Sequence, residues 1–195
     1  MVVEYESKYG VKPEITLITH SHGGNVVLNM AALKDNDGDF AVQAILLACP
    51  VQHETKELVA DPFFKKVYSF YSTSDILQII DPQGMYKTDT NQKRHFELSK
   101  REFPVSDNLR QAQLRINGFG IMHIGFTLER FIELLPDIVS HTEQWEREEK
   151  SIEGQERILY ITLPEKKSCL FALPVDPDVV CSVFSKLKRT SNGNV

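Results

Sequence analysis

The feature that most limits the fold of this sequence is a strand pattern that runs directly into a helix pattern. The segment "EITLIT" at 14–19 has the density of β-branched residues that is typical of a buried strand, and Pro13 stands at its entry. Gly23 and Gly24 follow, and the next residues, "NVVLNMAAL", place their apolar side chains on one helical face. Together these patterns predict the first half of a βαβ unit.

The same alternation continues for most of the chain. Segments 40–50 and 65–75 have the composition of buried strands, and 113–120 is a candidate fourth strand with glycines at its exit. An amphipathic helix follows from "TLERFIELL", with an interruption expected at Pro136. Strands that alternate with helices predict an α/β fold, a three-layer sandwich in which helices cover both faces of a mainly parallel sheet.

The last part of the chain breaks this alternation. The segment "ERILYITLPEKKSCLFALP" has two apolar stretches around a Pro-Glu-Lys-Lys turn, which predicts a C-terminal antiparallel β-hairpin at 156–174. Residues 185–195 are polar and predict a disordered tail. We therefore expect a single domain over 1–174 whose core lies within 10–150.

Charge and composition exclude several classes of function. The 195 residues carry a formal net charge of −5, which offers no basic surface to a nucleic acid. No apolar run approaches the roughly 20 residues of a transmembrane segment, and the acidic N-terminal residues do not resemble a signal peptide. We expect a soluble, cytoplasmic protein. Its cysteines lack the spacing of a metal site and are interpreted as reduced thiols: Cys49, Cys169 and Cys181.

Two histidines flank one serine immediately after the first predicted strand, in the order His20-Ser21-His22. A His-x-His pair at a strand end can begin a zinc site, but such sites need further ligands. In a metallo-β-lactamase-like pattern Asp and His would follow, where this chain has Gly24 and Asn25. An amidohydrolase barrel also opens with His-x-His, but it typically needs about 250 residues. The sequence therefore favours no metal and no other cofactor.

The segment Thr19-His20-Ser21-His22-Gly23 fits the pattern small-x-Ser-x-small of a nucleophile elbow. A sharp strand-to-helix turn would raise the Ser21 hydroxyl above the sheet, and small residues two positions before and after it would prevent clashes. The backbone N–H of His22 would be one donor of an oxyanion hole. The plainer alternative is that Ser21 only caps the helix. The side chains of His20 and His22 are interpreted as packing or supporting groups.

A nucleophilic serine also needs a base and an orienting acid. The third predicted strand ends in "FYSTSD" and delivers Asp75 to a loop, and the fourth is followed by "GFGIMHIGF", which delivers His123. The plainer alternatives are a helix cap for Asp75 and a packed loop residue for His123. Other acids and histidines are less well placed in the predicted loops: Asp81, Asp89, His53, His95 and His141.

These three motifs, "THSHGGN", "YSTSD" and "GIMHIGF", resemble those of the α/β-hydrolase superfamily, specifically its lipase/esterase-like members with a His-Ser-x-Gly-Gly elbow. The resemblance spans roughly residues 10 to 150. It implies Ser21 as nucleophile, His123 as general base and Asp75 as the acid that orients it. The implied reaction is hydrolysis of a carboxylic ester or thioester through an acyl-enzyme, on a small acyl-ester or lipid-like substrate.

The chain departs from this family in one respect, because the family usually has several strands before the elbow. Here about a dozen residues precede "ITLIT", so the expected chain is the C-terminal part of such a fold or a shortened relative. Its open sheet edge would be completed by the hairpin, a second copy or a partner. The alternative function is therefore a non-catalytic binding module. A basic segment could attract an anionic head group or simply be solvated: Lys87, Lys93, Arg94, Lys100 and Arg101.

Overall fold

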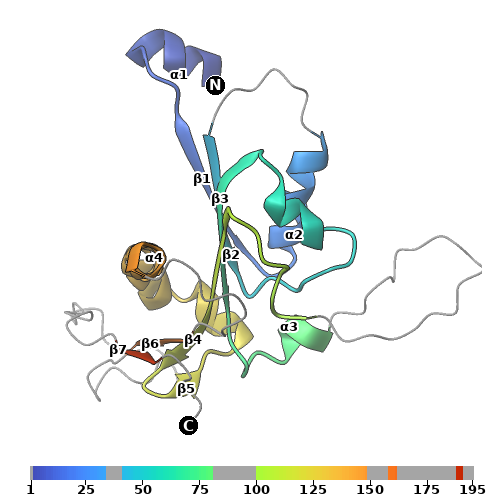
Figure 1. Cartoon of the computed structure of the whole chain (residues 1–195), viewed down its shortest axis with the longest axis vertical. Helices are drawn as coiled ribbons and strands as arrows, with labels where there is room; N and C mark the ends of the chain where they lie inside the picture. Colours follow the sequence, from blue (N-terminus) through green and yellow to red (C-terminus); the bar gives the residue numbers. More distant parts are fainter. Residues whose placement is uncertain (1, 34–40, 81–99, 149–157, 162–187, 191–195) are drawn as a thin grey trace, which may run out of the picture.

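The computed structural model describes residues 2–33, 41–80, 100–148, 158–161 and 188–190 (Figure 1). The helices are α1 (Val2–Tyr9), α2 (Gly23–Asn29), α3 (Leu77–Ile80) and α4 (Glu129–Glu148), with 3-10 turns η1 (Met30–Leu33), η2 (Lys56–Ala60) and η3 (His123–Thr127). The strands are β1 (Glu14–His20), β2 (Ala41–Leu47), β3 (Phe64–Tyr71), β4 (Leu109–Ile116), β5 (Phe119–Gly120), β6 (Ile158–Ile161) and β7 (Lys188–Thr190).

The strands form one mainly parallel sheet, which confirms the predicted α/β class. Its order is β1-β2-β3-β4-β6-β7, and β5 pairs with β4 beside this path. The pairs from β1 through β4 to β6 are parallel, whereas β5 and β7 pair antiparallel with their neighbours. Because the first four strands in this order are also consecutive in the chain, their carboxyl ends lie along one edge in chain order.

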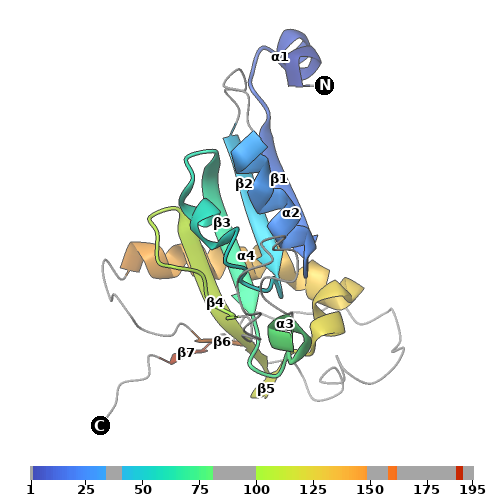
Figure 2. The same cartoon turned by 90° about the vertical axis from the view of Figure 1, so that its right-hand side faces the viewer.

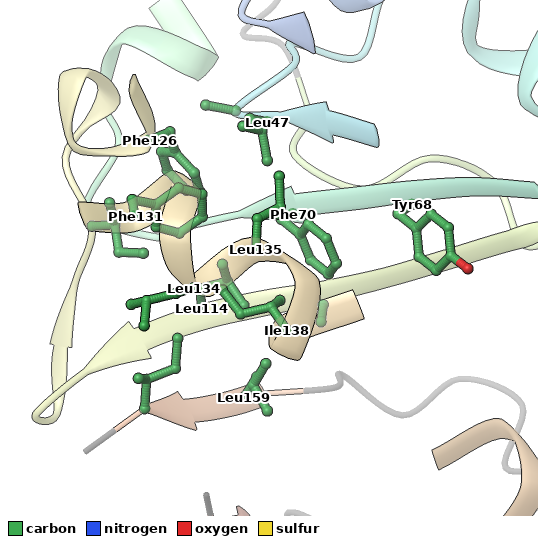
Figure 3. Close-up of a cluster of buried hydrophobic side chains, with 14 of the residues drawn as sticks. Leu47, Tyr68, Phe70, Leu114, Phe126, Phe131, Leu134, Leu135, Ile138 and Leu159 are labelled. Carbon is green, nitrogen blue, oxygen red and sulfur yellow. The ribbon is translucent and has the colours of Figure 1, made fainter. Parts of the chain in front are cut away.

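Helices lie on both faces of the sheet, as Figures 1 and 2 show for α2 and α4. On one face α2 packs over β1 and β2, where Leu28 meets Leu46 in a buried cluster. On the other face α4 covers the sheet, and Figure 3 shows Phe126 and Phe131 beside Leu47. Leu46 and Leu47 therefore face opposite clusters, as alternate residues of a strand must. The two buried clusters, one on each face, stabilise the sheet ends that carry the candidate site.

The long helix α4 continues through Pro136, where the sequence predicted an interruption. Proline cannot donate to the carbonyl four residues earlier, which belongs to Ile132. Both residues lie on the exposed side of the helix, so water can bond to that carbonyl. On the other side Leu134, Leu135 and Ile138 are buried in the cluster of Figure 3. Their burial holds the helix together across the proline.

The predicted fourth strand is broken in the structure. β4 begins four residues earlier than the predicted start at 113 and ends at Ile116, and β5 turns back to pair with it. Asn117 and Gly118 both have positive φ angles, of 49° and 83°. An Asn-Gly pair adopts this conformation easily and produces a two-residue hairpin turn. The single strand predicted over 113–120 is therefore wrong, because "NG" was a turn signal within it.

The C-terminal predictions are only partly covered by the structure. β6 corresponds to the first strand of the hairpin expected at 156–174, and the second strand lies outside the described residues. Within the predicted tail at 185–195, the three residues of β7 pair with β6. The hairpin, the tail as a whole and the domain limits at 1–174 stay predictions.

Strand β1 lies at the edge of the described sheet, and its only strand partner there is β2. Its Ile18 side chain is 52% exposed although it stands in a predicted buried strand. Helix α1 extends away from the sheet beyond the start of β1 (Figures 1 and 2). Among the helices in the described ranges, none has the length and apolar character needed to cross a bilayer.

Candidate functional site

The chain turns sharply at Ser21, between the end of β1 and the start of α2. Ser21 has a φ angle of 56°, in the left-handed region that non-glycine residues rarely adopt. Its N–H donates to the carbonyl of Leu47 at 2.9 Å, and its own carbonyl accepts from the N–H of Gly24 at 3.0 Å. Such a conformation costs on the order of 1–3 kcal/mol and persists only where surrounding bonds fix it. Ser21 therefore has the strained turn geometry of an elbow.

Two glycines after Ser21 have different steric demands. A Cβ atom on Gly24 would lie 2.4 Å from the Sγ atom of Cys49, closer than any real contact. A Cβ on Gly23 would lie 3.6 Å from the Cβ of Thr19, an ordinary contact distance. The tightest requirement for a small residue therefore falls three positions after the serine, rather than two as the sequence pattern predicted. Thr19 lies opposite Gly23, and this position has room for a methyl group.

Asp75 follows β3 and is buried, with its residue 1% exposed. Its Oδ1 accepts from the backbone N–H of Gln78 at 3.0 Å, as a helix cap does. Its Oδ2 lies 2.7 Å from Nδ1 of His123. The two carboxylate oxygens of Asp75 therefore have different partners, one in a cap-like contact and the other on the His123 ring.

His123 begins η3, the short turn between β5 and α4. Because a carboxylate can only accept, the bond to Asp75 places a proton on Nδ1 of His123 and leaves the lone pair of the neutral ring on Nε2. That is the tautomer a general base requires. The segment leading to His123 passes close to the loop of Asp75, since a Cβ on Gly120 would lie 2.2 Å from the Ser74 hydroxyl oxygen. A glycine is needed at this crossing.

Arg101 supports the loop that carries Asp75. Its Nε donates to the carbonyl of Ser72 at 3.0 Å, and one of its terminal nitrogens donates to the carbonyls of Thr73 and Asp75 at 3.1 and 2.9 Å. The sequence placed Arg101 in a basic segment that might attract an anion, whereas its guanidinium group bonds to the backbone. No local pattern could have revealed this role, because the partners lie 26 to 29 residues away. Of that segment, Lys87, Lys93 and Arg94 lie outside the described residues.

The two histidines beside Ser21 bond to different parts of the fold. The Nε2 atom of His20 lies 3.0 Å from the carbonyl oxygen of His123, and the two imidazole rings pack with centroids 4.4 Å apart. The exposed His22 ring has its Nδ1 3.4 Å from the amide nitrogen of Gln52. In the described ranges, no group of three or more His, Cys, Asp or Glu residues is arranged to hold a metal ion.

Two of the remaining candidates from the sequence lie in the described residues, on other elements of the fold. His53 is exposed in the loop after β2, and His141 lies on α4 with its Nδ1 3.2 Å from the side-chain oxygen of Gln144. Asp81, Asp89 and His95 lie outside the described residues.

Ser21, Asp75 and His123 lie on segments that come together at one end of the sheet. Ser21 directly follows β1, Asp75 follows β3, and His123 follows the β4–β5 hairpin. Figure 2 shows α3, which begins just after Asp75, beside the yellow segment that leads into α4. The His20–His123 and Asp75–His123 bonds connect all three segments. None of the protein-family models, curated proteins or solved structures compared with this chain matches it.

Proposed function

We propose that this chain is a serine hydrolase that cleaves a carboxylic ester or thioester through an acyl-enzyme. The observation that carries the proposal is the 2.7 Å bond between Nδ1 of His123 and the buried carboxylate of Asp75, with the His123 carbonyl bonded to His20, the residue before the strained turn at Ser21. A buried acid that orients an imidazole beside a serine is the arrangement of a catalytic triad. The α/β-hydrolase resemblance of the sequence supports the same assignment.

In the proposed reaction, Nε2 of His123 accepts the hydroxyl proton of Ser21 as Oγ attacks the substrate carbonyl carbon. The backbone N–H of His22, next to the nucleophile at the start of α2, donates to the oxyanion. The imidazolium then gives its proton to the departing alcohol or thiol, leaving the acyl group on Oγ. Water attacks the acyl-enzyme in the same manner and restores the serine. Asp75 keeps its negative charge throughout and stabilises the imidazolium.

Exposed apolar side chains next to the acid and the base favour an apolar acyl substrate. Ile76 and Leu77 follow Asp75 and are 61% and 62% exposed, and Met122 and Ile124 flank His123 at 58% and 72%. An apolar acyl chain bound there would bury surface that is otherwise in water, at about 25 cal/mol per Å². The proposed substrate class is therefore a small acyl ester or a lipid-like ester.

The second candidate function is a non-catalytic hydrolase-like module. The observation that favours it is the exposed edge of β1, where a partner or second copy could complete the sheet. A missing neighbour at β1 would also remove one oxyanion donor, and such a loss typically costs about 10²–10³ in rate.

A fluorophosphonate probe tests the proposal directly. A triad attacks its phosphorus, so the Ser21 Oγ–P bond forms, fluoride leaves and His123 takes the proton. Intact mass should show one adduct on the unmodified chain and none on Ser21→Ala or His123→Ala. His53→Ala is the matched control, because it also removes an imidazole in a strand-end loop and should label normally.

Circular dichroism must show that each variant is folded before its result is interpreted. A folded, unmodified chain that does not label, or a Ser21→Ala variant that does, would contradict the hydrolase assignment. The first result would favour the binding module instead.

A further inference from the structure

The proposed nucleophile and base follow strands that are not neighbours in the sheet. In the sheet, β1 and β4 are separated by β2 and β3, so their axes lie about 14 Å apart at ordinary strand spacing. His123 leaves the β4 side of the sheet, yet its carbonyl oxygen lies 3.0 Å from Nε2 of His20, the last residue of β1. The His20 side chain therefore joins the strand of the nucleophile to the segment of the base.

The pairing of β1 with β2 explains why His20 points toward this segment. His20 pairs with Leu47, and Ile18 pairs with Ile45. Paired residues of neighbouring strands share a face, and Leu47 and Ile45 belong to the core cluster that also contains Phe126 of η3. His20 thus stands on the face that η3 and α4 cover.

The direction of the bond fixes the tautomer of His20. A backbone carbonyl can only accept, so Nε2 of His20 carries the proton and donates it to His123. Burial lowers the pKa of His20, and the nearby His123 ring lowers it further, while the bond to the His123 carbonyl and the charge of Asp75 raise it in part. The lowered pKa favours the neutral form of His20, so the His20 ring adds no positive charge beside the imidazolium that forms on His123.

We propose that His20 is a positioning residue: its Nε2–H···O=C bond holds the His123 backbone so that the imidazole stays in reach of both Ser21 and Asp75. This role rests on the proposed hydrolase function. Without the bond, η3 loses its hydrogen bond to the His20 side chain, and the imidazole can shift while still bonded to Asp75. A displacement of about 1 Å in such a site can cost about 100-fold in rate.

Two variants separate the hydrogen bond from the ring contact. His20→Gln keeps an N–H donor near the position of Nε2 but removes the ring, whereas His20→Phe keeps a ring and removes the donor. The expected result is that fluorophosphonate labelling slows by up to about 100-fold in His20→Phe and stays close to that of the unmodified chain in His20→Gln. His53→Gln is the control for replacing an imidazole elsewhere.

A spectroscopic readout makes the test independent of activity. The Nδ1 proton of His123, bonded to Asp75, should give a downfield NMR signal that is sharp in the unmodified chain and in His20→Gln. It should broaden in His20→Phe as the ring samples other positions. If His20→Phe lowers the melting temperature strongly, His20→Leu replaces it as the donor-free variant.

Equal labelling and an unchanged His123 signal in the donor-free variant would overturn the positioning role, as would a loss in His20→Gln as large as in His20→Phe. Failure of the proposed function looks different. In that case the unmodified chain does not label, while the effect of the His20 variants on the His123 signal can still be measured.

Discussion

Ser21 occupies a backbone conformation that glycine adopts freely and other residues do not, with a φ of 56°. The sequence pattern predicted a sharp turn there because a serine hydroxyl must stand clear of the sheet to react. The structure shows the bonds that hold the turn, from Ser21 to Leu47 and from Gly24 to Ser21. Stability alone would favour glycine at this position, whereas the proposed function requires a serine hydroxyl.

The strain at Ser21 predicts an unusual order of stability between two variants. Ser21→Gly should be more stable than Ser21→Ala by roughly 1 kcal/mol, because only glycine avoids the cost of a positive φ angle. The free energy of unfolding by denaturant measures the difference. The control is the exposed Val26 in the middle of α2, where the Gly variant should instead be less stable than the Ala variant. The same order at both positions would contradict the strained turn.

Gly23 and Gly24 should differ in how much stability the protein loses when each is replaced by alanine. Gly24→Ala should destabilise the protein by about 1–3 kcal/mol, because its new methyl group would overlap Cys49. Gly23→Ala should change the stability little, since its methyl group meets Thr19 at an ordinary distance. Thermal unfolding of the pair tests the prediction, and equal losses would show that the packing at Cys49 is looser than described.

The orienting role of Asp75 predicts a loss of reactivity without a loss of fold. Asp75→Asn can still accept from Gln78, but its amide no longer selects the His123 tautomer with the proton on Nδ1. Under the proposed function the labelling rate should fall by roughly 10³–10⁴, the loss typical of a triad that loses its acid. Asp61→Asn is the control, because Asp61 is also a loop acid whose carboxylate accepts from a backbone N–H. Rapid labelling of Asp75→Asn would remove Asp75 from the triad.

At the scale of elements, the sequence predicted the first three strands well, including β1, which lies at the edge of the described sheet and has no fully buried residue. β1, β2 and β3 have dense β-branched and apolar residues, so a local pattern was sufficient to find them. The β4–β5 turn and the continuous α4 were missed for opposite reasons. The "NG" signal at Asn117 was outweighed by a strand pattern, and the Pro136 signal was outweighed by tertiary burial on the other face of the helix.

An ion-pair cluster fastens α4 to β3. Lys66 donates to both carboxylate oxygens of Glu143, at 2.6 and 2.8 Å, and the Tyr68 hydroxyl donates to one of them. Burial raises the pKa of Glu143, but the bonds from Lys66 and Tyr68 and the charges of Lys66 and Arg110 outweigh it and hold the pKa below its ordinary value of 4.5. The cluster therefore stabilises the ionised carboxylate.

The lowered pKa of Glu143 predicts how its contribution to the free energy of unfolding depends on pH. A carboxylate whose pKa is lowered by folding contributes stability above its unfolded pKa and loses it as the pH falls through the lower folded value. Glu143→Gln should cost about 1–2 kcal/mol of unfolding free energy at pH 7, and the difference from the unmodified chain should shrink below pH 4.5. Glu14→Gln, which removes an exposed pair with Lys65, should have little effect. A deficit that stays constant down to acid pH would contradict the cluster.

At the scale of the whole molecule, the order of Ser21, Asp75 and His123 along the sheet edge could be predicted from the sequence, whereas the contacts between their segments could not. Order follows from placing each residue after a successive strand, and parallel strands put those ends along one edge. The supports provided by Arg101 and His20 depend on partners 26 to 103 residues away. Such contacts arise from the tertiary fold, and a single sequence contains no pattern that specifies them.

The separation of 103 residues between His20 and His123 also has a consequence for biosynthesis. At roughly 5–20 residues per second, a ribosome needs about 5–20 seconds to add that length of chain. Ser21 is thus made well before His123, and long-range contacts of this kind form slowly in folding. A nascent chain stalled before His123 should not react with the fluorophosphonate probe, whereas the released chain should. Labelling would then measure when the fold is complete, and a stalled chain that labels would show that Ser21 is activated without His123.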